Sequence, residues 1–454
     1  MRRTARTFAA ALAVAVASAA VLTAPRTGAE PAAQAHTTAP PAGAGASPAR
    51  GQTSPTNLGN DANGNPLRLA TKTGHISNYD ESKAGAPTLP DPLTFADGRK
   101  VKSTADWTKR RGEILKLYET SIYGSVPANA PSVTWSVDEA DPKGRSGSAL
   151  VKRVIGRFGN VPDGPAMRVT LVTPAGAKNR VPVILLINFG GGPPTPPIAG
   201  RGPAAPGDPP VADEILARGW GYAMVGYQDI QPDRANAFTD GVIGLTLAPG
   251  LSAPASNEWG TIGAWAWATS RIIDYLVTDP QVDGRRIALQ GFSRLGKTTL
   301  WAAAQDTRVV ALFTACSGEM GAALARRDFG ETVDDMAQNF PWQFSGAFQQ
   351  WVGRWNEMPV DAHMLIALVA PRPVFISGGT QDQWADPKGQ VLAAQAAAPV
   401  YQLLGHKDLH VDTLPAPDEA VTTGAIGWRY HVGPHAVPAD DWRAFLAFLA
   451  PVFK

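Results

Sequence analysis

A serine between glycines follows a short apolar run in the sequence Gly291-Phe292-Ser293-Arg294-Leu295-Gly296-Lys297. Residues 286–289 read as a buried strand, and the residues after Ser293 follow a helical pattern. A tight turn from a strand into a helix lifts a serine hydroxyl clear of the sheet and points the following amide, here that of Arg294, toward the same space. A hydroxyl so placed can attack an ester carbonyl, and the amide can stabilise the oxyanion that results.

The match to such a nucleophile turn is partial. Glycine usually stands two positions after the serine, but Leu295 occupies that place and Gly296 comes one position later. Ser293 could instead cap the N-terminus of the following helix, as serine often does. The turn alone fits catalysis and capping equally well, so the decision depends on a base and an acid elsewhere in the chain.

An acid stands where a parallel sheet usually places its chemistry. The apolar run 373–377 predicts a strand, and the loop that leaves it ends at Asp382. Sites of α/β proteins lie at the carboxyl ends of such strands. Asp382 is therefore the leading candidate for the carboxylate that fixes the tautomer of a catalytic histidine and steadies its charge.

The base must come from the histidines. His36 and His75 lie far upstream of the serine. The remaining candidates follow Ser293 in sequence: His363, His406, His410, His431 and His435. We favour His435, because its loop contains Gly433 and Pro434 and precedes a closing helix over 440–449, from which an imidazole can reach back over the sheet. His363 is expected to have a structural hydrogen-bonding role.

The elements that position these residues alternate along the chain. Apolar runs predict buried strands over residues 166–171, 181–187, 221–225, 286–289, 309–314 and 373–377. Helical patterns cover residues 263–276, 297–304 and 388–398. Residues 133–138 and 150–158 alternate in polarity, as antiparallel edge strands do. The pattern predicts an α/β fold with a mixed, mostly parallel sheet and helices on both faces.

The N-terminal region differs in composition from the rest. Residues 1–29 combine early arginines with an apolar run, 8–22, and then small residues, which is typical of a secretory signal peptide. The run is shorter than the roughly 20 residues of a spanning helix, so we expect a secreted protein with no membrane contact after cleavage. Residues 30–60, rich in Ala, Pro and Gly, predict a disordered tether. Residues 61–454 are expected to form one catalytic domain, acting as a monomer.

Charge and cysteine content exclude several classes of function. The chain has 41 Lys and Arg against 39 Asp and Glu, a formal net charge of +2, which gives no basic surface that argues for nucleic-acid binding. Cys316 is the single cysteine, so the chain can form neither an intramolecular disulfide nor a metal site built from cysteines.

The serine turn resembles the Gly-Cys-Ser-Arg-x-Gly-Lys signature of the glucuronoyl esterases, carbohydrate esterase family fifteen. Further blocks resemble bacterial members in the same order: 258–267 (Glu-Trp-Gly-Thr-Ile-Gly-Ala-Trp-Ala-Trp), 361–365 (Asp-Ala-His-Met-Leu), 370–373 (Ala-Pro-Arg-Pro), 384–389 (Trp-Ala-Asp-Pro-Lys-Gly) and 430–435 (Tyr-His-Val-Gly-Pro-His). The resemblance implies an α/β-hydrolase fold and cleavage of esters between 4-O-methyl-glucuronic acid groups of glucuronoxylan and lignin alcohols. It also implies that no metal or cofactor takes part.

The resemblance assigns roles to individual residues. Ser293 matches the family nucleophile and His435 its base. Arg294 matches an arginine whose side chain joins the oxyanion hole, a role that suits a guanidinium. Lys297 matches a lysine that binds sugar hydroxyls.

Three more residues fall where the family contacts the sugar. Trp384 matches a tryptophan against the uronate ring, as sugar C–H faces pack on aromatic surfaces. Core packing is its alternative role, since the chain has 13 tryptophans. Glu331 and Gln338 lie in a stretch where the family keeps further sugar-contacting residues.

Two departures from the family affect the site. The family acid often lies in a Glu-Ser-Gly sequence after the strand that follows the turn, but here Cys316 stands in place of the glutamate. A thiol cannot act as that acid, so the role passes to Asp382, with Glu319 and then Asp386 in reserve. Phe292 replaces a cysteine that fungal members tie into a disulfide, and its packing is expected to hold the turn instead.

Two other functions remain open. An acetyl-type carbohydrate esterase would use the same triad on a different acyl group. A catalytically inactive carbohydrate-binding relative would keep the fold and the sugar pocket, although the catalytic residues of this chain are all intact.

Overall fold

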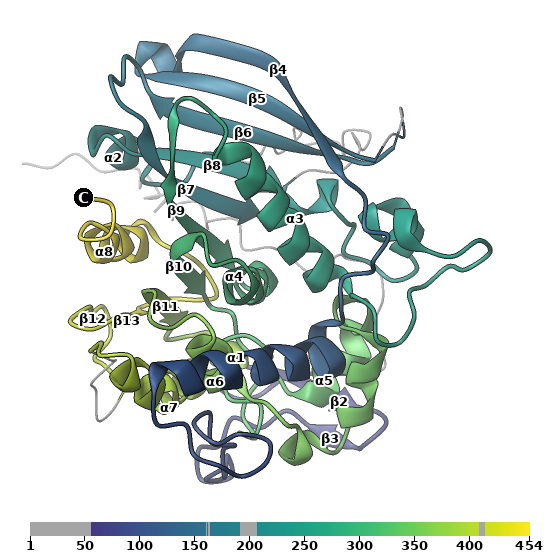
Figure 1. Cartoon of the computed structure of the whole chain (residues 1–454). Helices are drawn as coiled ribbons and strands as arrows, with labels where there is room; N and C mark the ends of the chain where they lie inside the picture. Colours follow the sequence, from purple (N-terminus) through teal and green to yellow (C-terminus); the bar gives the residue numbers. More distant parts are fainter. Residues whose placement is uncertain (1–55, 160, 162–163, 191–206, 408–413) are drawn as a thin grey trace, which may run out of the picture. The chain divides into compact units, whose positions relative to one another are not determined.

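One sheet carries most of the strands in the computed structural model (Figure 1), which describes residues 56–159, 161, 164–190, 207–407 and 414–454. The strands lie in the order β12-β13-β11-β10-β9-β7-β8-β6-β5-β4. Their bounds are β4 Val133–Gly144, β5 Ala149–Phe158, β6 Ala166–Pro174, β7 Val181–Asn188, β8 Gly221–Gly226, β9 Val282–Phe292, β10 Val309–Ala315, β11 Val374–Gly379, β12 Ala420–Val421 and β13 Ile426–His431.

The sheet is mixed, as the sequence predicts. Strands β8, β7, β9, β10, β11 and β13 pair in parallel, and these include five of the six apolar runs that were expected to be buried. The sixth run, residues 166–171, lies in β6, which pairs antiparallel with β5 and β8. Strands β4, β5 and β6 pair antiparallel at one edge, and β12 pairs antiparallel at the other. The serine turn follows β9, and Asp382 follows β11, so both lie at the carboxyl end of the parallel strands.

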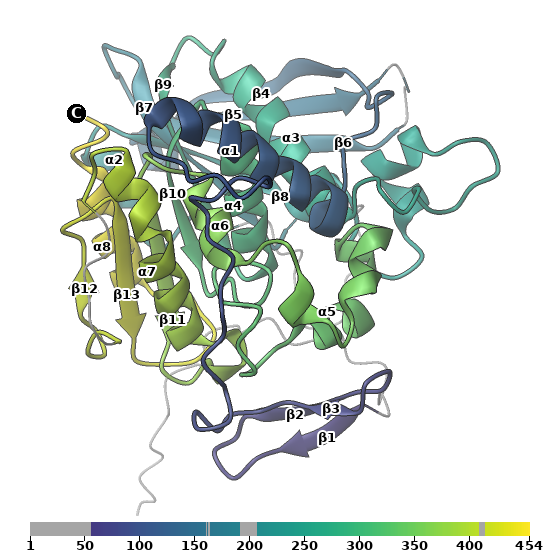
Figure 2. The same cartoon turned by 60° about the horizontal axis from the view of Figure 1, so that its bottom comes forward.

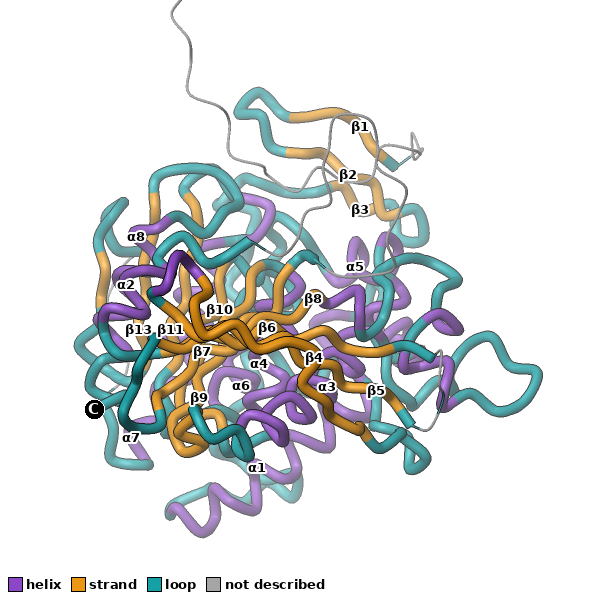
Figure 3. Tube along the Cα trace, turned by 90° about the horizontal axis from the view of Figure 1, so that it is seen from above, coloured by secondary structure: helices purple, strands orange, loops and turns teal. Residues whose placement is uncertain are grey.

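Helices cover both faces of the sheet, because the parallel strands are apolar on both (Figure 3). Along β7, Val183 and Leu185 pack in one buried cluster with α1, α3, α4, α6 and α7, whereas Ile184 and Leu186 pack in a second cluster with α2 and α8. The helices are α1 Thr104–Tyr118, α2 Ala212–Ala217, α3 Thr261–Leu276, α4 Arg294–Gln305, α5 Val333–Asn339, α6 Ala362–Ala367, α7 Pro387–Leu403 and α8 Ala439–Leu449. None of the described helices is long and apolar enough to cross a membrane.

A second, three-stranded sheet lies near the N-terminus (Figure 2). It consists of β1 Asn57–Asn60, β2 Pro66–Ala70 and β3 His75–Ile76, paired antiparallel. The predicted end of the tether at residue 60 is therefore wrong, because backbone pairing with β2 holds residues 57–60 as a strand. The predicted signal peptide and residues 30–55 of the tether lie outside the described residues. All the described residues belong to one compact unit.

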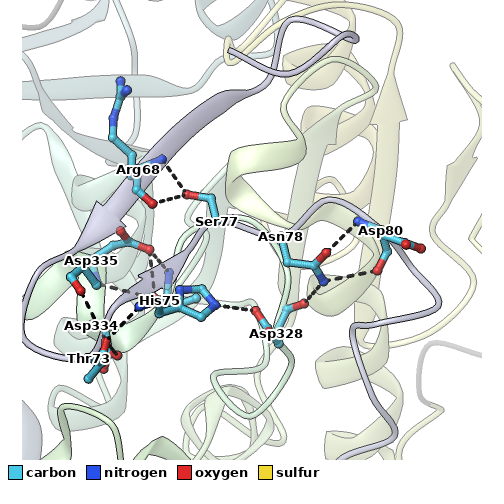
Figure 4. A network of polar contacts seen from close by, with 11 residues as sticks. Arg68, Thr73, His75, Ser77, Asn78, Asp80, Asp328, Asp334 and Asp335 are labelled. Atoms are coloured by element: carbon cyan, nitrogen blue, oxygen red, sulfur yellow. Dashed lines mark hydrogen bonds and ion pairs between the residues drawn. The ribbon is translucent and has the colours of Figure 1, made fainter. Parts of the chain in front are cut away.

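Polar contacts join the residues around β3 to the first turn of α5 and to the segment that precedes it (Figure 4). The Thr73 hydroxyl donates to Asp334 at 2.6 Å, and His75 Nε2 lies 2.9 Å from an Asp328 carboxylate oxygen. The Asn78 amide donates to the Asp328 carbonyl at 2.6 Å. The small sheet is thus fastened to residues 328–335, which include Glu331.

Candidate active site

Ser293 occupies a strained position between β9 and α4. Its φ is +59° and its ψ is −129°, a combination that residues other than glycine rarely adopt. The turn is held by the Ser293 amide, which donates to the Ala315 carbonyl at 2.8 Å. Although Ser293 is the residue before α4, its side chain makes no capping hydrogen bond. This geometry favours the nucleophile turn over the capping role.

The two glycines of the motif are required by close packing. A Cβ on Gly291 would lie 2.2 Å from the Leu295 carbonyl oxygen, so the turn could not close. A Cβ on Gly296 would lie 2.8 Å from the Thr314 hydroxyl, at the contact between α4 and β10. The displaced glycine thus serves helix packing, while Leu295 is fully buried.

His435 and Asp382 form a hydrogen-bonded pair beside this turn. His435 Nδ1 lies 2.6 Å from Asp382 Oδ2, and the Asp382 side chain is 4% exposed against 38% for His435. The imidazole ring contacts the Phe292 ring, with 4.5 Å between the ring centroids. A neutral imidazole that donates from Nδ1 to a carboxylate keeps Nε2 free to accept a proton. Because Phe292 immediately precedes Ser293, its contact with His435 shows that the pair of His435 and Asp382 lies next to the nucleophile turn.

The reserve acids have other surroundings. Glu319 is buried, and its Oε1 has no hydrogen-bond partner among the described residues. Burial, reinforced by the charges of Asp361 and Glu331, raises the pKa of Glu319 well above its usual value. Asp386 pairs with Arg327 at 2.9 Å and caps α7. Of the three acids, Asp382 is the one that holds His435.

The other described histidines downstream of Ser293 are committed elsewhere or exposed. His431 Nδ1 lies 2.8 Å from Asp441 Oδ2, and its Nε2 lies 3.1 Å from the Pro434 carbonyl, so neither nitrogen is free. His363 Nε2 bonds the Pro90 carbonyl at 2.8 Å, which agrees with the expected structural role. His406 is exposed, and His410 lies outside the described residues.

Cys316 lies against the acid rather than replacing it. Its buried thiol is within hydrogen-bonding reach of Asp382 and of the Ala436 carbonyl, and burial raises its pKa well above the usual value. Ligand atoms of Cys316, Asp382 and His435 lie within 4.8 Å of one another, and among the described residues this is the group that could hold a metal ion. In the structure His435 Nδ1 is instead committed to Asp382.

Arg294 contributes both its backbone and its side chain. As the first residue of α4 it presents an amide at a positive helix terminus, where N–H groups have no intrahelical acceptor. Its guanidinium donates to Asp233 and lies over the Phe340 ring, 5.1 Å from the centroid. Asp233 was not predicted, although it follows β8 by one loop and shares with Asp382 the signal of an acid beyond a parallel strand.

Lys297, Glu331 and Trp384 come together as a group. Lys297 Nζ lies 3.8 Å from Glu331 Oε2, and the Trp384 indole donates to the same carboxylate. Burial lowers the pKa of Lys297 and raises that of Glu331, and the attraction between the two opposes both shifts. Gly330 has a φ of +67°, and a Cβ there would lie 2.6 Å from the Trp384 carbonyl, so glycine permits this approach.

Gln338 points elsewhere. Its carbonyl oxygen accepts from the Thr71 amide and hydroxyl at 2.7 and 2.8 Å, and its amide donates to the Leu69 carbonyl. It lines a cavity of about 520 Å³ together with Trp342 and Phe344. The structure does not bring Gln338 into the group formed by Lys297, Glu331 and Trp384.

Comparisons with known proteins agree with the fold. Residues 254–405 match the family model described as glucuronyl esterase, fungi. The chain is 40% identical over 397 residues to carbohydrate esterase MZ0003 from an unknown prokaryotic organism, covering 82% of this chain and 91% of that protein. It is 30% identical over 335 residues to 4-O-methyl-glucuronoyl methylesterase 1 of Wolfiporia cocos, covering 71% and 73%.

A solved structure extends the likeness to the fold. The glucuronoyl esterase from Solibacter usitatus is 38% identical, and the match covers 83% of this chain and 100% of that one with a TM-score of 0.76. The predicted α/β-hydrolase fold is thereby confirmed. The chain belongs to the glucuronoyl esterases of carbohydrate esterase family fifteen, which are carboxylic-ester hydrolases.

Proposed function

We propose that this protein hydrolyses esters of glucuronic acid and its 4-O-methyl ether with Ser293 as the nucleophile. The observation that carries the proposal is the 2.6 Å hydrogen bond between His435 and Asp382 beside the strained serine turn. Membership of the family, whose Wolfiporia cocos relative is a 4-O-methyl-glucuronoyl methylesterase, supports the choice of acyl group.

The reaction follows from the roles of these groups. Ser293 Oγ attacks the ester carbonyl while His435 Nε2 takes its proton, and Asp382 stabilises the imidazolium. The amide and guanidinium of Arg294 hold the oxyanion. Its collapse breaks the bond to the alcohol, which receives the proton from His435. Water then attacks the acyl-enzyme and gives a proton to His435, which passes it to Ser293 Oγ as the bond to the acyl group breaks and glucuronate is released.

Lys297, Glu331 and Trp384 are the proposed sugar-binding group. A buried ammonium and a carboxylate can donate to and accept from sugar hydroxyls, and the partly exposed indole can pack on the C–H face of the ring. The ester links between glucuronoxylan and lignin fit this chemistry as the natural substrate. Action on such insoluble material also fits export through the predicted signal peptide.

Hydrolysis of benzyl glucuronate tests the proposal. Ser293→Ala should abolish it while the melting temperature stays close to that of the wild type, because the serine side chain makes no capping bond. If the wild type leaves benzyl and methyl glucuronate intact but deacetylates xylan, the protein is an acetyl-type esterase. If a fluorophosphonate fails to label Ser293, the protein is a carbohydrate-binding relative without catalysis.

A further inference from the structure

A buried carboxylate, that of Asp233, contacts the side chain of Arg294. The Asp233 side chain is 1% exposed, and its Oδ2 accepts from the Arg294 guanidinium. Its Oδ1 accepts from Trp342 Nε1 at 2.7 Å and from Gln343 Nε2 at 2.8 Å. Two donors from a separate segment thus fix the carboxylate, and the carboxylate in turn fixes the arginine.

Arg294 needs such an anchor. Its side chain is 29% exposed and long, so without a partner it would sample many rotamers. The Phe340 and Phe189 rings, 5.1 and 5.9 Å from the guanidinium carbon, flank it but do not fix its direction. A guanidinium has five N–H donors, and the contact with Asp233 is made through Nη1, so donors remain for a developing oxyanion.

We propose that Asp233 is a positioning residue for the reaction and sets the direction of the Arg294 guanidinium toward the oxyanion. The inference rests on the proposed function, in which Arg294 stabilises that charge. Oxyanion stabilisation depends on donors that are already oriented before the charge develops. Asp233 supplies this orientation without touching the substrate, through a chain of contacts that runs from Trp342 and Gln343 to Arg294.

The first test is Asp233→Asn, which keeps the shape of the side chain but removes its charge. The turnover number should fall by about 10-fold or more, while KM changes by less than about 3-fold, because an oxyanion donor acts in the transition state. The matched control is Asp279→Asn. Asp279 is also a buried carboxylate, 2.8 Å from Lys152 Nζ, in a pair away from the serine turn. The control should lower the melting temperature and leave the turnover number unchanged.

A double-mutant cycle separates positioning from a general structural effect. In the Arg294→Gln background, Asp233→Asn should lower the turnover number by less than about 2-fold, because the group that it positions is gone. An equal loss in both backgrounds, or wild-type turnover in Asp233→Asn, would overturn the inference. The cycle is run on benzyl glucuronate and on 4-nitrophenyl acetate. Wild-type hydrolysis of the acetate alone would contradict the proposed acyl group, while the cycle on the acetate would still decide the role of Asp233.

Discussion

The contact between Asp382 and His435 decides which acid supports catalysis. Asp382→Asn should lower the turnover number on benzyl glucuronate by about 10⁴-fold, because an amide stabilises the wrong tautomer of the histidine and cannot balance its positive charge. Glu319→Gln is the matched comparison, since Glu319 is buried near the turn but has no bond to His435. Its turnover number should stay within about 3-fold of wild type. A larger loss in Glu319→Gln than in Asp382→Asn would assign the acid to Glu319.

Single residues differ in how well sequence predicts their place. Ser293, Asp382 and His435 were predictable because each follows or precedes an element whose type the sequence pattern reveals. Asp233 was not, because its role depends on donors from a segment more than a hundred residues away. The interpretation of Gln338 rested on a stretch of sequence without a fixed register, and its bonds to Thr71 and Leu69 place it outside the group formed by Lys297, Glu331 and Trp384.

At the scale of elements, the start of α5 contains a buried acid whose charge works against folding. Asp335 completes a capping box with Thr332, and burial raises its pKa to about 6. A pKa raised above 3.8 means that the folded state binds the proton of Asp335 more tightly than the unfolded state does. Protonation of Asp335 therefore stabilises the fold, and this contribution is complete below pH 4. It is lost as the pH rises through 6.

Asp335→Asn should therefore change the pH dependence of stability. The amide oxygen can still accept the capping bonds, but the side chain no longer titrates. Relative to wild type, the free energy of unfolding of the variant should improve on the order of 2 kcal/mol between pH 4 and pH 7.5. Urea unfolding at both pH values measures this difference. Parallel pH profiles for the two proteins would show that Asp335 titrates normally.

Strands that bury apolar side chains were easier to predict from the sequence than strands that are exposed. The parallel strands β7, β8, β10 and β11 were predicted within a few residues, whereas β9 begins earlier, at Val282, and β13, Ile426–His431, was not predicted as a strand. The strand β1, Asn57–Asn60, is exposed along its length and is mostly polar. Its structure comes from backbone pairing with β2, which leaves no periodic signal in the side chains. The tether was therefore predicted to extend through it.

At the scale of the whole described structure, the N-terminal sheet contacts the segment that carries Glu331, one of the proposed sugar-binding residues. The Gly330 amide donates to the Asn78 carbonyl at 2.8 Å, and the Glu331 amide donates to the Trp384 carbonyl at 2.9 Å. The segment 328–335 is thus held on one side by residues 73–78 and on the other by the Asp382 loop. Weaker contacts between residues 73–78 and the segment 328–335 should therefore change the position of Glu331, which belongs to that segment.

The attachment through His75 should depend on pH. The hydrogen bond to Asp328 raises the pKa of His75, so its stabilising contribution is complete below pH 6.5 and is lost as the pH rises through the raised value. Asp328→Asn should lower the free energy of unfolding by about 0.5–1 kcal/mol at pH 6 and by less at pH 9, since the pair is partly exposed. Asp97→Asn, in an exposed pair with Arg99, should show no such difference between the two pH values. An equal loss at pH 6 and pH 9 in Asp328→Asn would mean that the neutral hydrogen bond, rather than the charge of His75, fastens the N-terminal sheet.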